Sequence, residues 1–183
     1  MNGKRIALYA FVVVALLLVV AGIVYLSNPY QGYVPFTSNA YNVSFMYPQS
    51  WSVTSQVYQT GTPAKSIVLF PTSSGRYVQM HITSLPAAAP EAKTFSFLLY
   101  NTTLNAVLAD SGNLTANKNI TLSGYAAREF AGTAGGGSAF LYILANATTN
   151  YFIIQYIAAN ASAYSRFLPQ AQNIIGSIRL NGQ

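Results

Sequence analysis

The sequence predicts an α+β protein, with one N-terminal transmembrane helix followed by an antiparallel sheet flanked by helices. Its expected element order after the anchor is β-β-β-β-α-β-β-β-β-α. Residues 6–26 carry no charged side chain, and a helix needs about 20 such residues to cross a bilayer. Beyond them, short segments alternate apolar and polar residues as half-buried strands do. Two later segments repeat apolar residues at helical spacing, and strand runs broken by single helices indicate an α+β sandwich.

The charges around the apolar segment predict its orientation. Lys4 and Arg5 precede it, and the next basic residue is Lys65. The positive-inside rule therefore places residues 1–5 in the cytoplasm and the rest of the chain outside, as a single-pass protein of the cell membrane. A cleaved signal peptide is an alternative, and a pilin-like leader is another. Val19–Gly22 is a poor cleavage site inside the apolar run.

The next segment reads as a stalk leading into the folded domain. Residues 27–38 contain two prolines and a glycine, a composition typical of a linker. The domain is expected to occupy residues 39–183 and to open with four strands, which turn residues separate from one another. These strands are expected near 41–47, 51–57, 65–70 and 76–85.

A helix, four strands and a second helix are expected in the remainder. Leucines and other apolar residues at helical spacing predict the first helix, from about Phe95 to Leu108. The last two of the four strands are apolar on both faces, so they are expected to be central in the sheet. The final helix has Ser162 as its candidate N-cap and Pro169 inside it. The four strands are expected at 114–122, 125–133, 138–147 and 150–158.

The composition excludes several kinds of chemistry. The chain has 9 Lys+Arg against 3 Asp+Glu, and only 7% of its residues are charged. It has no cysteine, which removes disulfides, thiol catalysis and most structural zinc sites. Beyond Lys4 and Arg5, the basic residues are scattered singly, whereas nucleic-acid binders cluster them. We therefore expect no nucleic-acid partner.

No catalytic, cofactor-binding or metal-ligating residues are predicted. His81, the single histidine, alternates with Gln79 and Thr83, which places it on a polar strand face rather than in a catalytic triad. The Gly135–Gly137 run has no lysine and helix after it, so it indicates a hairpin connection rather than a phosphate loop. The acidic residues are far apart in the sequence: Glu91, Asp110 and Glu129.

Asparagine sequons and tyrosines are the two remaining signals. Six N-x-S/T sequons predict glycosylation, with an ordinary asparagine-rich surface as the alternative. Fourteen tyrosines include Tyr30, Tyr33, Tyr58 and Tyr77 at stalk or polar-face positions. Exposed tyrosines are typical of recognition surfaces, although they also serve as neutral surface residues. The candidate glycosylation sites are Asn42, Asn101, Asn113, Asn119, Asn146 and Asn160.

Three short motifs resemble those of the PsbP-like family. They are Phe45-Met46-Tyr47-Pro48 with Trp51, Gly124 before a strand, and the segment 174–180 near the end. The resemblance covers Tyr41 to Leu180. It implies a central antiparallel sheet flanked by helices and a non-enzymatic binding or accessory role, and it carries over no functional residue.

The resulting hypothesis is a membrane-tethered, glycosylated, extracytoplasmic accessory domain that binds a protein partner at the membrane. The membrane would be contacted through the N-terminal helix, and no cofactor is expected. The alternative is a structural subunit of a surface layer or filament. The sequence identifies neither the partner nor a ligand.

Overall fold

The computed structural model divides the chain into two units, Met1–Gly32 and Tyr33–Gln183. Each is described by itself. The structure describes a set of residue ranges, without the side chains of 3–11, 24, 26, 56 and 57. These ranges are 3–57, 65–89, 92–94, 97, 100–101, 104–105 and 112–180.

The first unit contains helix α1, Gly3–Leu26, where the sequence led us to expect a transmembrane anchor at residues 6–26. Within the residues that the structure describes, no helix is long and apolar enough to span a membrane. The prediction of an anchor is therefore corrected. The predictions that depended on the anchor are corrected too: the single-pass location, the extracellular placement and the membrane as a partner.

The second unit contains two antiparallel sheets. The smaller sheet has the order β1-β2-β10, formed by β1 (Tyr33–Ser38), β2 (Val43–Pro48) and β10 (Arg179–Leu180). The larger sheet has the order β3-β4-β5-β9-β8-β7-β6. Its strands are β3 (Trp51–Val57), β4 (Lys65–Pro71), β5 (Val78–Pro86), β6 (Asn113–Leu122), β7 (Tyr125–Thr133), β8 (Ala139–Asn146) and β9 (Asn150–Ala158).

Strands β8 and β9 lie in the interior of the larger sheet, as their apolar composition predicts. The β6–β7 and β7–β8 connections are tight turns. Ser123 and Gly124 both have positive φ, which a two-residue hairpin requires, and they join β6 to β7. The 3₁₀ turn η2 (Gly135–Gly137) joins β7 to β8, which confirms the expected hairpin connection there.

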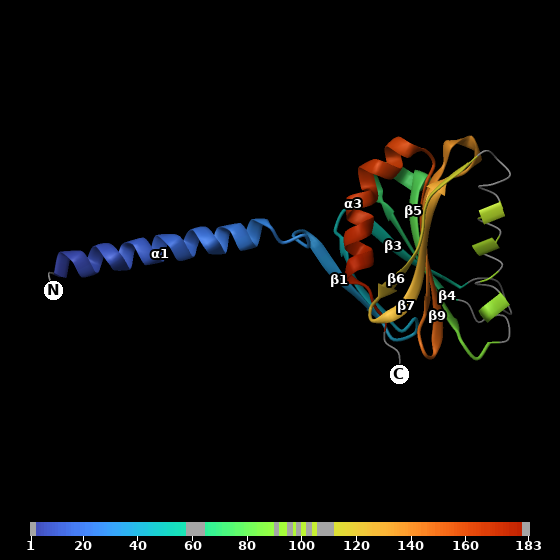
Figure 1. The fold of residues 1–183 in the computed structure, drawn as a ribbon, viewed down its shortest axis with the longest axis horizontal. Coiled ribbons are helices and arrows are strands. Elements are labelled where there is room, and N and C mark those ends of the chain that lie inside the picture. Colours follow the sequence, from blue (N-terminus) through green and yellow to red (C-terminus); the bar gives the residue numbers. More distant parts are fainter. Residues whose placement is uncertain are drawn as a thin grey trace. The chain divides into compact units, whose positions relative to one another are not determined.

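Helix α3 (Ala161–Ser177) covers one face of the larger sheet, as Figure 1 shows. Its buried residues Phe167, Ala171 and Ile174 pack in the main hydrophobic core. Asn160 is the N-cap, because its side chain accepts a hydrogen bond from the Ala163 N–H at 2.8 Å. The expected cap, Ser162, is instead inside the first turn. Pro169 also lies inside the helix.

The opposite face of the sheet carries a second, aromatic core. Phe130, Phe140 and Tyr142 form it, with Tyr100 packed against them. Tyr100 is helical, as are the other described residues in 92–105, and this segment lies on the side of the sheet away from α3 (Figure 1). The rest of the helix expected at Phe95 to Leu108 lies outside the described residues.

The expected fold class also needs correction, because the described chain is mostly β-sheet with few helices. Residues 33–38, expected in the stalk, form strand β1 because they pair with β2 along their whole length. The C-terminal strand β10 pairs with the other edge of β2. The observed order therefore has an additional strand at each end of the expected series.

Candidate functional site

Tyr77 is the most exposed aromatic residue among the described residues of the folded unit. It ends the 3₁₀ turn η1 (Thr72–Tyr77) immediately before β5, and its side chain is 73% exposed. Gly75 allows the turn because its φ is +56°, a value that other residues rarely adopt. The Tyr77 carbonyl accepts a hydrogen bond from the Ala159 N–H at 2.8 Å. The backbone below this exposed ring is therefore tied to the end of β9.

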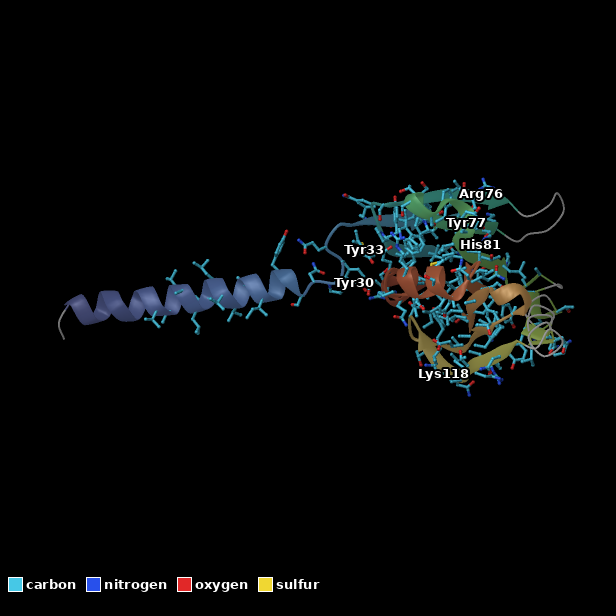
Figure 2. All side chains as sticks on the ribbon, turned by 90° about the horizontal axis from the view of Figure 1, so that it is seen from above. Tyr30, Tyr33, Arg76, Tyr77, His81 and Lys118 are labelled. Carbon is cyan, nitrogen blue, oxygen red and sulfur yellow. The ribbon has the colours of Figure 1, made fainter. Side chains whose placement is uncertain are left out.

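Two surface hollows share Tyr77 as a wall. The smaller, of about 250 Å³, is also lined by Arg76, Gln79 and His81. The larger, of about 630 Å³, lies between η1 and the start of α3 and is lined by Arg166 among others. In Figure 2, Arg76, Tyr77 and His81 lie together on one side of the domain, whereas Lys118 lies on the other. We refer to Arg76, Tyr77 and Arg166, with the two hollows, as the Tyr77 surface.

Neither arginine of the Tyr77 surface has an acidic partner among the described residues. The Arg166 guanidinium lies 5.2 Å from the centre of the Phe167 ring, a cation–π contact that orients it without neutralising it. In the described part of the chain, the ion pair is Lys118 with Glu129, at 3.2 Å. No acidic residue is among those that line either hollow.

His81 forms the floor of the smaller hollow as part of a short hydrogen-bond chain. Its Nε2 lies 3.0 Å from the Gln79 Oε1, and the Gln79 Nε2 donates to the Arg76 carbonyl at 2.9 Å. Because the amide oxygen only accepts, this arrangement assigns the hydrogen to Nε2. The side chain is half-buried, and burial lowers the pKa of His81 below its ordinary value.

The polar strand face expected for His81 is confirmed, but it is less exposed than the sequence suggested. Thr83 is buried and its hydroxyl donates to the Ser66 hydroxyl at 3.2 Å. Within the described chain, the His81 Nδ1 is buried and has no hydrogen-bond partner. The contacts of His81 are thus to an amide, and they include neither the hydroxyl nor the carboxylate that triad chemistry requires.

Of the three acidic residues, Glu129 is the one that lies among the described residues. Glu129 faces Lys118, and the burial of Tyr164, assisted by the nearby Glu129, raises the pKa of that tyrosine. Glu91 and Asp110 lie outside the described residues. Across the residues that are described, no group of three histidine or acidic side chains is placed to hold a metal ion.

The six sequons occupy different environments. Four of the asparagines are exposed and two are partly buried. Asn160 lines the larger hollow of the Tyr77 surface, and two of the others line a third hollow together. The exposed four are Asn113, Asn119, Asn146 and Asn160, and the partly buried two are Asn42 and Asn101.

Comparisons with known proteins place the fold in a recognisable class, a twisted antiparallel sheet with helices on its faces. No family model and no curated protein matches the sequence. The solution structure of cyanobacterial PsbP from Synechocystis sp. PCC 6803 matches with a TM-score of 0.56 and 11% identity, over 81% of this chain and 92% of that one. The fold is therefore PsbP-like, as the motifs at residues 45–51 and 174–180 predicted.

Two weaker structural matches are also found. A Bacteroides thetaiotaomicron VPI-5482 protein gives a TM-score of 0.48 at 10% identity, over 80% of this chain and 47% of that one. LpqN of Mycobacterium tuberculosis, described as involved in cell envelope biogenesis, gives 0.43 at 15% identity, over 80% and 84%. At these levels of similarity the matches identify no shared site.

Sequence reasoning found one member of the Tyr77 surface and missed the other two. Tyr77 was selected as an aromatic residue on a polar face. Arg76 and Arg166 were counted only as scattered charges, because they are far apart in the sequence. The signal that could have found Arg76 is its position beside Tyr77 after a Pro-Thr-Ser-Ser-Gly turn.

Proposed function

We propose that this domain is a non-enzymatic accessory domain that binds an acidic segment of a protein partner through the Tyr77 surface. The observation that carries the proposal is an exposed tyrosine shared by two hollows, each of which also contains an arginine with no ion-pair partner in the described chain. The PsbP-like fold supports a binding role only by analogy, so the argument rests on the surface itself.

Tyrosine and arginine are the residue types that most often dominate binding energy at protein interfaces. Tyr77 offers a large apolar ring and a hydroxyl while losing few rotamers on binding. Arg166 is already held against Phe167, so less conformational freedom remains to be lost when it meets a carboxylate. The hollows on either side can receive neighbouring side chains of the partner.

Charge supports an acidic rather than a basic partner. The chain has a formal net charge of +6 at pH 7, and no acidic side chain lines the Tyr77 surface. A net positive domain attracts negative segments over a distance of about one Debye length, roughly 8 Å in physiological salt. Complementary charge of this kind increases the association rate and discriminates against basic partners.

A labelled peptide rich in Asp and Glu, with a single Leu as an apolar anchor, tests the proposal by fluorescence anisotropy. Tyr77→Ala and Arg166→Gln are each expected to weaken binding about tenfold, the loss of roughly 1.4 kcal/mol. Lys118→Gln removes one cation from the far side of the domain and is the matched control. If Lys118→Gln weakens binding as much as Arg166→Gln, the peptide recognises net charge rather than this surface.

The alternative role, a subunit of a layer or filament, predicts a different behaviour. Purified chain that forms regular arrays in electron micrographs, with Tyr77→Ala leaving the arrays intact, would favour that role. A monomer that binds the acidic peptide would favour the accessory role.

We also propose that the domain carries N-linked glycans at its exposed sequons. The four exposed sequons are accessible for modification, and attached glycans would hydrate a surface that is poor in charge. A sugar on Asn160 would stand at the edge of the larger hollow. Occupancy at that position is therefore expected to compete with the partner.

A further inference from the structure

A third hollow lies where the β6–β7 and β8–β9 hairpins separate. Pairing between β7 and β8 begins at Ala127 with Ala145. Each hairpin continues past this point. The β6–β7 hairpin is paired as far as Leu122 with Tyr125, and the β8–β9 hairpin as far as Asn146 with Tyr151. The divergence leaves an open hollow of about 470 Å³, within the 300–1,000 Å³ range typical of small-molecule sites.

The lining of this hollow is mostly apolar, with one cation. Ile120, Ala126 and Leu144 contribute to its apolar walls, and Arg128 supplies the charge. No acidic residue is among the described residues that line it. This combination suits a ligand that has an apolar body and a negative end.

Arg128 is held in place by two uncharged neighbours, and within the described residues it has no acidic partner. Its Nε donates to the Asn117 Oδ1 at 2.9 Å, and its guanidinium carbon lies 5.2 Å from the centre of the Tyr100 ring. The Asn117 amide in turn donates to the Tyr100 hydroxyl at 3.2 Å. Among the described residues, the hydrogen bond of the guanidinium uses Nε, so the terminal N–H groups of the fork can bind a carboxylate with both of its oxygens.

We propose that this hollow binds a small amphipathic carboxylate, with the carboxylate on Arg128 and the hydrocarbon body against Leu144 and Ile120. The site is separate from the Tyr77 surface and does not depend on the proposed acidic partner. Asn119 and Asn146 line the same hollow, so a glycan on either asparagine would compete with the ligand.

The test uses purified full-length chain from a bacterial host without N-linked sugars, and calorimetric titration with decanoate below its micelle concentration. Decanol, which has the same body without the charge, and acetate, which has the charge without the body, are the matched probes. Decanoate is expected to bind at least about tenfold more tightly than either, since the charged hydrogen bonds and the apolar burial each contribute to its affinity.

Two variants locate the binding. Arg128→Gln removes the charge, and Ala126→Phe fills the hollow from an exposed position; each is expected to weaken decanoate binding at least about tenfold. Lys118→Gln is the control, and thermal unfolding checks that each variant is folded. No decanoate binding, equal binding of decanol, or binding that both variants leave unchanged would overturn the proposal.

Discussion

A single residue, Asn160, shows how the sequence and the structure differ in detail. Sequence reasoning assigned the N-cap of the last helix to Ser162, because serine before an apolar stripe is a common cap signal. The structure assigns it to Asn160, two residues earlier, through the bond to the Ala163 N–H. Asparagine is as good a cap as serine. Propensity alone therefore could not choose between them.

The same residue gives a prediction that separates capping from glycosylation. Asn160→Ala is expected to lower the free energy of unfolding by about 1 kcal/mol, because the α3 cap is lost. Ser162→Ala destroys the sequon but leaves the cap, so it should change stability far less. Urea unfolding of protein without sugars measures both. Equal destabilisation by the two variants would contradict the assignment of the cap.

In a glycosylating host, both variants are expected to remove one glycan from the protein, visible as the same gain in gel mobility. Identical mobility of the wild-type chain before and after enzymatic deglycosylation would remove the sugar prediction for all six sequons.

His81 gives a pH dependence whose direction follows from its burial. Burial favours its neutral form, so the folded chain takes up the proton at a lower pH than the unfolded chain, whose ordinary pKa is 6.5. Proton uptake by the unfolded chain therefore lowers stability as the pH falls below about 6.5. The strand neighbours of His81, Val68 and Gln155, do not ionise, and the charged residue that lines the same hollow is Arg76.

Unfolding by urea at pH 7.5 and pH 5.0 measures this effect. The wild-type chain is expected to lose stability between the two values, and His81→Gln is expected to lose less. The account of His81 is wrong if the variant shows the full pH dependence of the wild type.

At the scale of elements, the strands of the larger sheet were predictable because they are specified locally. Alternation along Trp51–Val57, for example, needs no knowledge of the partner strand, and its observed bounds agree with those expected. Strands β1 and β10 were missed for the opposite reason. Tyr33–Ser38 contains Pro35 and reads as a linker, and Arg179–Leu180 is too short to have a period.

The β6–β7 hairpin contains an irregularity that only the structure reveals. The register shifts between Leu114 and Ala116, and Gly132 packs closely against the Asn113 carbonyl, where a Cβ would collide with that backbone oxygen. Gly132→Ala is therefore expected to destabilise the chain by about 1–3 kcal/mol, the usual range for overpacking. Gly22→Ala, where a Cβ would meet nothing, is the control. If Gly132→Ala is as stable as the wild type, the β6 backbone at Asn113 can move aside without a loss of stability, which would contradict this expectation.

At the scale of the whole molecule, the composition could not predict which residues form the Tyr77 surface. The Tyr77 surface joins η1 and β5 to the start of α3, segments about half the folded unit apart in sequence. These segments lie close together because β9 pairs with β5 in the sheet. Helix α3 follows β9 directly in the chain, so it begins near the start of β5. Local patterns carry no information about that pairing, which is why Arg166 was not linked with Tyr77.

Photo-crosslinking in the native cells tests the central claim most directly. A benzophenone amino acid replaces Tyr77 in one variant and Phe97, another exposed aromatic residue at 64%, in the other. The account predicts that the probe at 77 captures one protein through a segment rich in Asp and Glu, and that capture is lost when Arg76 and Arg166 are both changed to Gln. Equal capture at 97, or capture through a segment without acidic residues, would contradict it.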